Sequence, residues 1–363
     1  MSHHSLSAIL LAAVLIPGAA HADDGSVYYK KGFVIETDGG DNKLKITSRI
    51  QSRLDYADSD ADDVDPTLAF YNPRVRLKLA GNVFGDDWKY TFEADWGKGG
   101  TGLKDYRVDY VFNDKLMLRV GQYKKPFYRQ QMTSSGKMEF MERAITDKAF
   151  GAGRDIGVML HNGITKGDGV EWAVMLGNGS KDNTTVGEVM HPLVVGRLGW
   201  NSEGLKAYSE MDLEGGAARF GIAANAIIDG PGVFEAADTN EGDVRAGADW
   251  IVKANGFAHS GGVLYSMAQT GEDYLSTLEA DQFGAFLQAS YVVDGKFGPA
   301  VRYGRLQALD DSEASTNEYV GSLTYIFQGH NTKWQLDGSI IDNIVGDESV
   351  RTTGARTQLQ FAF

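Results

Sequence analysis

The sequence predicts an all-β protein whose strands form a transmembrane antiparallel β-barrel of about 16 strands. One observation is the end of the chain, where Leu359, Phe361 and Phe363 share one face of an alternating run that stops on an aromatic residue. A second is that long segments of alternating apolar and polar residues fill most of the chain. The third is that aromatic residues stand at the segment ends, where a barrel places its two interfacial girdles.

The N-terminus has the pattern of a secretory signal peptide. Residues 7–16 are apolar, and Ala20-His21-Ala22 supplies a small-x-small cleavage pattern, although the preceding residues contain no Lys or Arg. We expect cleavage after residue 22. Residues 23–42 are then a short N-terminal periplasmic segment, and residues 43–363 form the barrel.

The composition agrees with an all-β fold. The chain has 363 residues with 45 Gly, 17 Phe, 16 Tyr and no Cys. A secreted chain without Cys does not rely on disulfides, and high Gly and aromatic content favours barrels and sandwiches. A barrel of this length can be a single domain.

The first barrel segment shows the alternation clearly. Leu44, Ile46 and Ile50 share one face, whereas Arg49 and Gln51 occupy the other. A soluble sandwich would show the same alternation, but segments of about 9–13 residues suit tilted membrane-spanning strands. The segments are predicted near 44–56, 70–83, 88–96, 104–112, 115–123, 155–162, 169–178, 192–200, 218–228, 244–253, 257–269, 282–293, 297–307, 317–327, 332–342 and 351–363.

The connections alternate between long and short, as the outer loops and periplasmic turns of a barrel do. Short connections are expected at 113–114, 294–296 and 328–331, and long ones at 57–68, 124–153, 229–243, 270–281 and 308–316. The stretch 201–217 does not follow this rule, because it is long but occupies the place of a short turn.

Charge is distributed unevenly between the loops and the rest of the chain. The chain has a formal net charge of −14. The six long loops 57–68, 179–191, 229–243, 270–281, 308–316 and 343–350 together hold 21 acidic residues and a single Lys. The remaining residues are therefore net basic, and 124–154 has seven Lys or Arg against three acidic residues. A lumen with basic walls would attract anions, although Glu93, Asp95, Asp105 and Asp109 are also expected to face it.

Motifs along the first half of the chain carry a resemblance to a known family. They are Ser48–Gln51, Asn72–Gly81, Asp87–Tyr90, Leu118–Phe127, Thr133–Ser135, Glu142–Ala144 and Arg154–Val158. Together, in this order and spacing, they resemble the phosphate-selective porin O/P family of Gram-negative outer membranes. The resemblance is densest over 43–200.

The resemblance implies a homotrimer of sixteen-stranded barrels in the outer membrane of a Gram-negative bacterium. It implies that the loop after the fifth strand, about 124–153, folds into the lumen and sets the constriction. By position it also implies pore-lining roles for Arg49, Arg74 and Lys89. The chain departs from the family at Pro73, where a second Arg is frequent, and at Gln131 and Gly136, near positions that are basic in phosphate-selective members.

These observations predict a porin for passive diffusion of small hydrophilic solutes, with a preference for anions that include phosphate. Arg and Lys donors would replace the water that an oxyanion loses on entry, at several moderate sites in series. The predicted pore-lining residues are Arg49, Arg53, Arg74, Arg76, Lys89, Lys124, Lys125, Arg129 and Arg143. Two alternatives stay open: a dedicated phosphate or polyphosphate channel, and a structural outer-membrane protein or adhesin that acts through its acidic loops.

The sequence contains no pattern that marks a metal, cofactor or catalytic site. The His residues lack zinc-ligand spacing, and there is neither a P-loop nor a Gly-x-Ser-x-Gly motif. We expect no enzyme activity and no cofactor. The expected partners are outer-membrane lipid and lipopolysaccharide, the barrel-assembly machinery through Phe363, further copies of the chain, and small permeating anions, but not nucleic acid.

Overall fold

The structure is a computed structural model that describes residues 25–165, 167–179, 193–229, 242–269, 281–309 and 314–363. The expected signal peptide and parts of the long loops after 178, 229, 269 and 309 lie outside these residues. Among the described residues no helix is long and apolar enough to cross a membrane.

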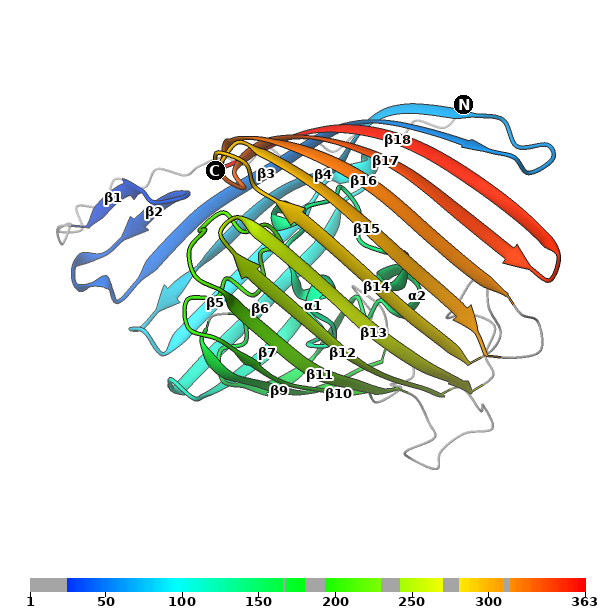
Figure 1. Ribbon diagram of the computed structural model, residues 1–363. Coiled ribbons are helices and arrows are strands. Elements are labelled where there is room, and N and C mark those ends of the chain that lie inside the picture. Colours follow the sequence, from blue (N-terminus) through cyan, green and yellow to red (C-terminus); the bar gives the residue numbers. More distant parts are fainter. Residues whose placement is uncertain (1–24, 166, 180–192, 230–241, 270–280, 310–313) are drawn as a thin grey trace, which may run out of the picture.

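Sixteen antiparallel strands, β3 to β18, close into a barrel, and β18 pairs with β3 at the seam (Figure 1). They are β3 Lys43–Ser59, β4 Thr67–Val83, β5 Trp88–Asp95, β6 Gly102–Asn113, β7 Leu116–Lys124, β8 Arg154–His161, β9 Gly169–Gly177, β10 Leu193–Asn201, β11 Arg219–Asp229, β12 Gly242–Ala254, β13 Phe257–Gln269, β14 Gln282–Tyr291, β15 Phe297–Ala308, β16 Ser315–Gln328, β17 Thr332–Val345 and β18 Glu348–Ala362. Each predicted segment corresponds to one of these strands, so the predicted fold class is confirmed.

The burial pattern is the inverse of that of a soluble protein. On β3, Gln51 and Arg53 are 0% and 1% exposed, whereas Ile50 and Leu54 are 41% and 39% exposed. Polar side chains therefore point into the barrel and apolar ones point outward, as a lipid environment requires. The soluble sandwich is excluded because it would bury the apolar face instead.

Aromatic rings gather where strands meet their turns. Trp88 on β5 stands 4.7 Å from Tyr110 on β6, between ring centroids. At another turn, Phe297 on β15 lies 5.0 Å from Tyr325 on β16. These outward rings lie at the short-turn end of the barrel and form the interfacial girdle that the sequence predicted.

A hairpin precedes the barrel within residues 23–42, the predicted N-terminal segment. It consists of β1 Ser26–Tyr29 and β2 Phe33–Glu36, and β2 pairs with the first residues of β3 (Figure 1). The ring of Phe33 packs 5.7 Å from that of the last residue, Phe363. The backbone of Phe363 also exchanges two hydrogen bonds with Ser48, at 3.0 and 3.1 Å. The last residue of the chain thus completes the closing seam.

Two connections pack inside the barrel. The first, residues 125–153, is termed the constriction loop; it contains α1 Arg129–Met132, a short 3₁₀ turn Ser135–Lys137 and α2 Ile145–Phe150 (Figure 1). Two further 3₁₀ turns, Asp38–Gly40 and Gly97–Gly99, lie outside it. The loop buries apolar side chains, Phe127 and Phe150 among them, against lumen-facing residues of the strands.

The second connection, residues 202–218, is termed the periplasmic segment. It links β10 to β11 at the short-turn end, and its Leu205 and Tyr208 pack on Ile251 of β12. The excess length noted in the sequence is therefore used to fill part of the lumen.

Candidate functional site

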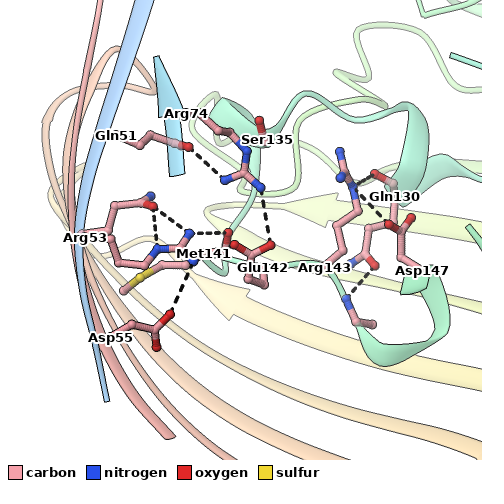
Figure 2. A network of polar contacts seen from close by, with 12 residues as sticks. Gln51, Arg53, Asp55, Arg74, Gln130, Ser135, Met141, Glu142, Arg143 and Asp147 are labelled. Atoms are coloured by element: carbon pink, nitrogen blue, oxygen red, sulfur yellow. Dashed lines mark hydrogen bonds and ion pairs between the residues drawn. The ribbon is translucent and has the colours of Figure 1, made fainter. Parts of the chain in front are cut away.

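The candidate site is the junction between the constriction loop and β3 and β4. Arg53 on β3 is 1% exposed and points at the loop (Figure 2). Its guanidinium donates to the Glu142 carboxylate at 2.6 Å and to the Met141 carbonyl at 3.2 Å. It also donates twice to the Gln358 side-chain oxygen on β18, at 3.1 and 2.8 Å. Arg53 therefore ties the loop to the barrel seam.

Arg74 on β4 approaches the same carboxylate from the neighbouring strand. It donates to Glu142 at 3.4 Å and to the side-chain oxygen of Gln51 at 2.9 Å (Figure 2). Burial raises the pKa of Glu142, but Arg74 and Arg53 outweigh it and lower this pKa to about 2. One carboxylate is thus shared by two guanidinium groups.

Arg49 contacts the loop through hydroxyls. Its two terminal nitrogens donate to Ser134 at 2.9 Å and to Ser135 at 3.0 Å. Among the described residues it forms no ion pair. A Cβ at Gly136 would lie 2.6 Å from the guanidinium, so glycine at this position leaves room for Arg49 to cross the loop. Glycine at position 136 of this chain therefore has a steric reason.

Lys124 and Arg143 converge on carbonyl groups at the end of α1. Lys124 donates to the Gln131 and Thr133 carbonyls at 2.7 and 3.0 Å. Arg143 donates to the Gln130 carbonyl at 2.9 Å (Figure 2). It also donates to the Thr133 carbonyl at 2.9 Å. The nearest carboxylate pairing for Arg143 is Asp147 at 3.8 Å, and burial raises the pKa of Asp147. Both side chains are thus held mainly by neutral oxygens.

Other predicted cations are paired with acids of the barrel wall. Arg76 binds Glu93 at 3.0 Å and Asp95 at 2.7 Å. The predicted inward carboxylates Asp105 and Asp109 are also paired, for example Asp105 with Arg154 at 2.7 Å. This part of the wall is polar and charge-balanced.

Two predicted residues at the root of the loop serve as attachments. Arg129 is 4% exposed and donates to Asp249 on β12 at 2.8 Å. Arg197 on β10 binds the same carboxylate at 2.7 Å. Lys125 lies 4.0 Å from Asp155. The sequence alone could not separate these anchoring cations from lumen cations, because both kinds stand in the same basic run.

The predicted set therefore divides in two. The first group forms ion pairs with carboxylates of the loop or of the barrel wall, and its members are Arg53, Arg76, Lys125 and Arg129. The second group is held by hydroxyls, by carbonyls or by the carboxylate shared with Arg53, or forms no ion pair among the described residues. Its members are Arg49, Arg74, Lys89, Lys124 and Arg143. Two or more of the second group, with the Ser134 and Ser135 hydroxyls, can offer N–H and O–H donors to an anion.

Sequence reasoning did not assign the periplasmic segment to the site. Its Tyr208 donates to Glu171 at 2.7 Å, and the Glu210 N–H donates to the Lys137 carbonyl of the constriction loop at 3.1 Å. The one signal in the sequence was the length of 201–217, and this length did not indicate whether the segment points into the lumen or away from it.

A comparison of sequences supports the predicted resemblance. The profile of the family described as phosphate-selective porin O and P matches residues 44–195, so the resemblance is confirmed over this part of the chain. An uncharacterized protein from Aquifex aeolicus (strain VF5) is 26% identical over 415 residues, which cover 99% of this chain and 100% of that protein.

Solved structures share the fold. An anion-selective porin from Comamonas acidovorans has a TM-score of 0.61 at 12% identity, covering 89% of this chain and 100% of its own. The outer membrane channel DcaP of Acinetobacter baumannii has 0.64 at 11% identity, covering 90% and 99%. OmpT of Vibrio cholerae in a trimer form has 0.56 at 10% identity, covering 88% and 99%. At these identities the likeness shows the fold alone, an antiparallel barrel of the porin type.

Proposed function

We propose that this porin-type barrel, matched over residues 44–195 by the phosphate-selective porin O and P family, is a passive diffusion channel that prefers small anions. The observation that carries the proposal is the excess of cations at the junction. Arg49, Arg74 and Arg143 meet there with few carboxylates, because Arg53 already shares Glu142 with Arg74.

The effect of these cations on a permeating anion depends on where their charges lie. Within a low-dielectric wall, a surplus of fixed positive charge raises the local anion concentration and lowers the entry barrier for anions. The raised pKa of Asp147 reduces the negative charge that would offset this surplus.

A phosphate-selective channel is the second candidate. Arg49 beside Ser134 and Ser135 presents the donor types that bind oxyanions. Against strict selectivity stand Pro73, Gln131 and Gly136, which remove three basic positions expected from the family. A structural outer-membrane protein is the third candidate, and it requires a lumen that does not conduct.

We also propose a homotrimer, by analogy with the trimer form of OmpT. Secretion through a cleaved signal peptide, contact with lipopolysaccharide and delivery by the barrel-assembly machinery complete the proposal. The seam contacts of Phe363 with Ser48 support a role for the last residue in assembly.

The test is single-channel conductance of the refolded protein in a planar bilayer with a potassium chloride gradient. Reversal potentials that give a chloride-to-potassium permeability ratio above one support the anion preference. A ratio at or below one refutes it. Addition of inorganic phosphate at low concentration then separates the first two candidates, since only a phosphate-selective channel shows block of the chloride current. Absence of conductance favours the structural protein.

A further inference from the structure

Two segments from opposite ends of the barrel meet inside it through a pair of buried carboxylates. Glu139 lies in the constriction loop and is 2% exposed, and Glu210 lies in the periplasmic segment and is 5% exposed. The Glu139 N–H donates to the Glu210 carboxylate at 2.8 Å. The Glu210 N–H donates to the Lys137 carbonyl at 3.1 Å. These reciprocal bonds join the two segments.

Within the part of the chain that the structure describes, the hydrogen-bond partners of the Glu139 carboxylate are neutral. The Ser290 hydroxyl donates to one oxygen at 2.6 Å, and the Gln288 amide donates to the other at 3.2 Å, both from β14. Among the described residues Glu139 forms no ion pair. A buried carboxylate without a bonded cation favours its neutral form, because desolvation destabilises the charged form.

The charged groups that surround Glu139 are mostly engaged elsewhere. Lys253 on β12 donates to the Met211 carbonyl at 2.7 Å, and Lys333 on β17 donates to the Met138 carbonyl at 2.6 Å. Asp337 on β17 accepts from the Met141 N–H at 2.8 Å and from the Ser322 hydroxyl at 2.6 Å. Both lysines favour ionised Glu139 from a distance, whereas Glu210 opposes it.

We propose that Glu139 and Glu210 form a proton-dependent latch, which holds the periplasmic segment against the constriction loop while Glu139 is protonated and releases it when Glu139 ionises. Burial first, and then the neighbouring Glu210, raise the pKa of Glu139 to about 8. Because the pKa in the closed junction is raised, the junction is most stable below about pH 4.3, the ordinary pKa of Glu. That stability is lost as pH rises through about 8.

Ionisation of Glu139 places two negative charges side by side within the closed junction, and their repulsion drives the periplasmic segment away from the loop. The segment fills part of the lumen through Leu205 and Tyr208. Its displacement therefore widens the path, so alkaline pH opens the channel further. This inference concerns regulation and does not depend on which ion the channel prefers.

The first test measures single-channel conductance of the refolded protein between pH 6 and pH 9.5 at constant salt. We expect a rise with a midpoint near pH 8 in the wild type. Glu139→Gln keeps a neutral acceptor for Ser290 and should hold the low conductance at every pH. Glu210→Gln removes the charge that repels ionised Glu139, so it should reduce the rise in conductance above pH 8. Glu348→Gln, an exposed acid at the outer end of β18, is the matched control and should retain the wild-type rise.

The second test needs no ion current. The chain has no Cys, so Ala207→Cys places a unique thiol in the periplasmic segment at a site that is 6% exposed. Its labelling by a maleimide should accelerate through pH 8, beyond the change seen for the same variant that also carries Glu139→Gln. This comparison removes the intrinsic pH dependence of the thiol.

A flat conductance in the wild type overturns the proposal, and so does a step that persists in Glu139→Gln. Equal labelling with and without Glu139→Gln also overturns it. Heat-dependent migration in detergent gels confirms that each variant forms a folded barrel. Because reversal potentials test the anion preference separately, a failed latch leaves the proposed function standing, and the labelling test remains valid if the barrel does not conduct.

Discussion

The guanidinium of Arg53 lies 2.6 Å from the carboxylate of Glu142, although 89 positions separate them along the chain. This contact fixes the middle of the constriction loop to the first barrel strand. Gln358 holds the other side of the same guanidinium from the last strand. The position of the loop is therefore coupled to the closure of the barrel at its seam.

Arg53→Ala should loosen the constriction loop without opening the barrel. Hydrogen bonds to charged groups contribute about 1.5–3 kcal/mol each, and the lower end applies here because Glu142 is 32% exposed. We expect noisier single-channel current and faster proteolysis within 125–153. Arg53→Lys, which keeps the charge but not the forked donors, should show an intermediate effect. If the single-channel current of Arg53→Ala is as quiet as that of the wild type, the anchoring role is contradicted.

Arg74→Ala combined with Lys89→Ala should lower the anion preference. A unit charge about 6 Å from an ion in an aqueous pore changes its energy by roughly 0.7 kcal/mol, or about threefold in permeability ratio. Reversal potentials in a chloride gradient measure this change. Arg351→Ala is the control, because Arg351 is 58% exposed and bound to Asp342 at the outer rim. Unchanged reversal potentials in the double variant would exclude both residues from the anion path.

Gly136→Ala should destabilise the loop only while Arg49 is present. The added methyl would lie 2.6 Å from the Arg49 guanidinium and displace it from Ser134 and Ser135. Loss of these hydrogen bonds costs about 1 kcal/mol. In the Arg49→Ala background the clash is absent, so the same substitution should have little effect. A double-mutant cycle on urea unfolding measures the coupling, and additive effects would show that Arg49 does not lie over Gly136.

Acid should release the constriction loop through Glu142. Its pKa in the folded protein is lowered to about 2, so its contribution to stability is complete above about pH 4.3, the ordinary pKa of Glu. That contribution is lost as pH falls through about 2. Proteolysis of the loop by an acid protease between pH 2 and pH 5 should accelerate toward the acid end. Glu142→Gln should be susceptible throughout this range, and an unchanged pH profile in that variant would refute the assignment.

The barrel could be predicted because its signals are local. Alternation places Arg49, Gln51 and Arg53 on one face of β3 whatever surrounds the strand. Turn residues and segment length then give the strand count, which the structure confirms. The motifs from Ser48 to Val158 gave the resemblance, which the family profile confirms over 44–195.

The functions of individual cations could not be predicted in the same way. Arg49 and Arg53 have the same orientation in sequence, yet Arg53 is bound to Glu142, whereas the hydrogen bonds of Arg49 to the described residues go to hydroxyls. The partners of both residues lie in the constriction loop, 85 and 89 positions away along the chain. No periodicity encodes such pairings.

The sequence by itself thus determined a barrel of sixteen strands, its inward polar face and the basic run 124–154, because these follow from side-chain order along the chain. The tertiary structure decided which cations are neutralised, that 202–218 enters the lumen, and that Glu139 meets Glu210. The physical reason is that burial and charge pairing depend on what lies opposite a side chain across the barrel, and chain closure alone sets that relationship.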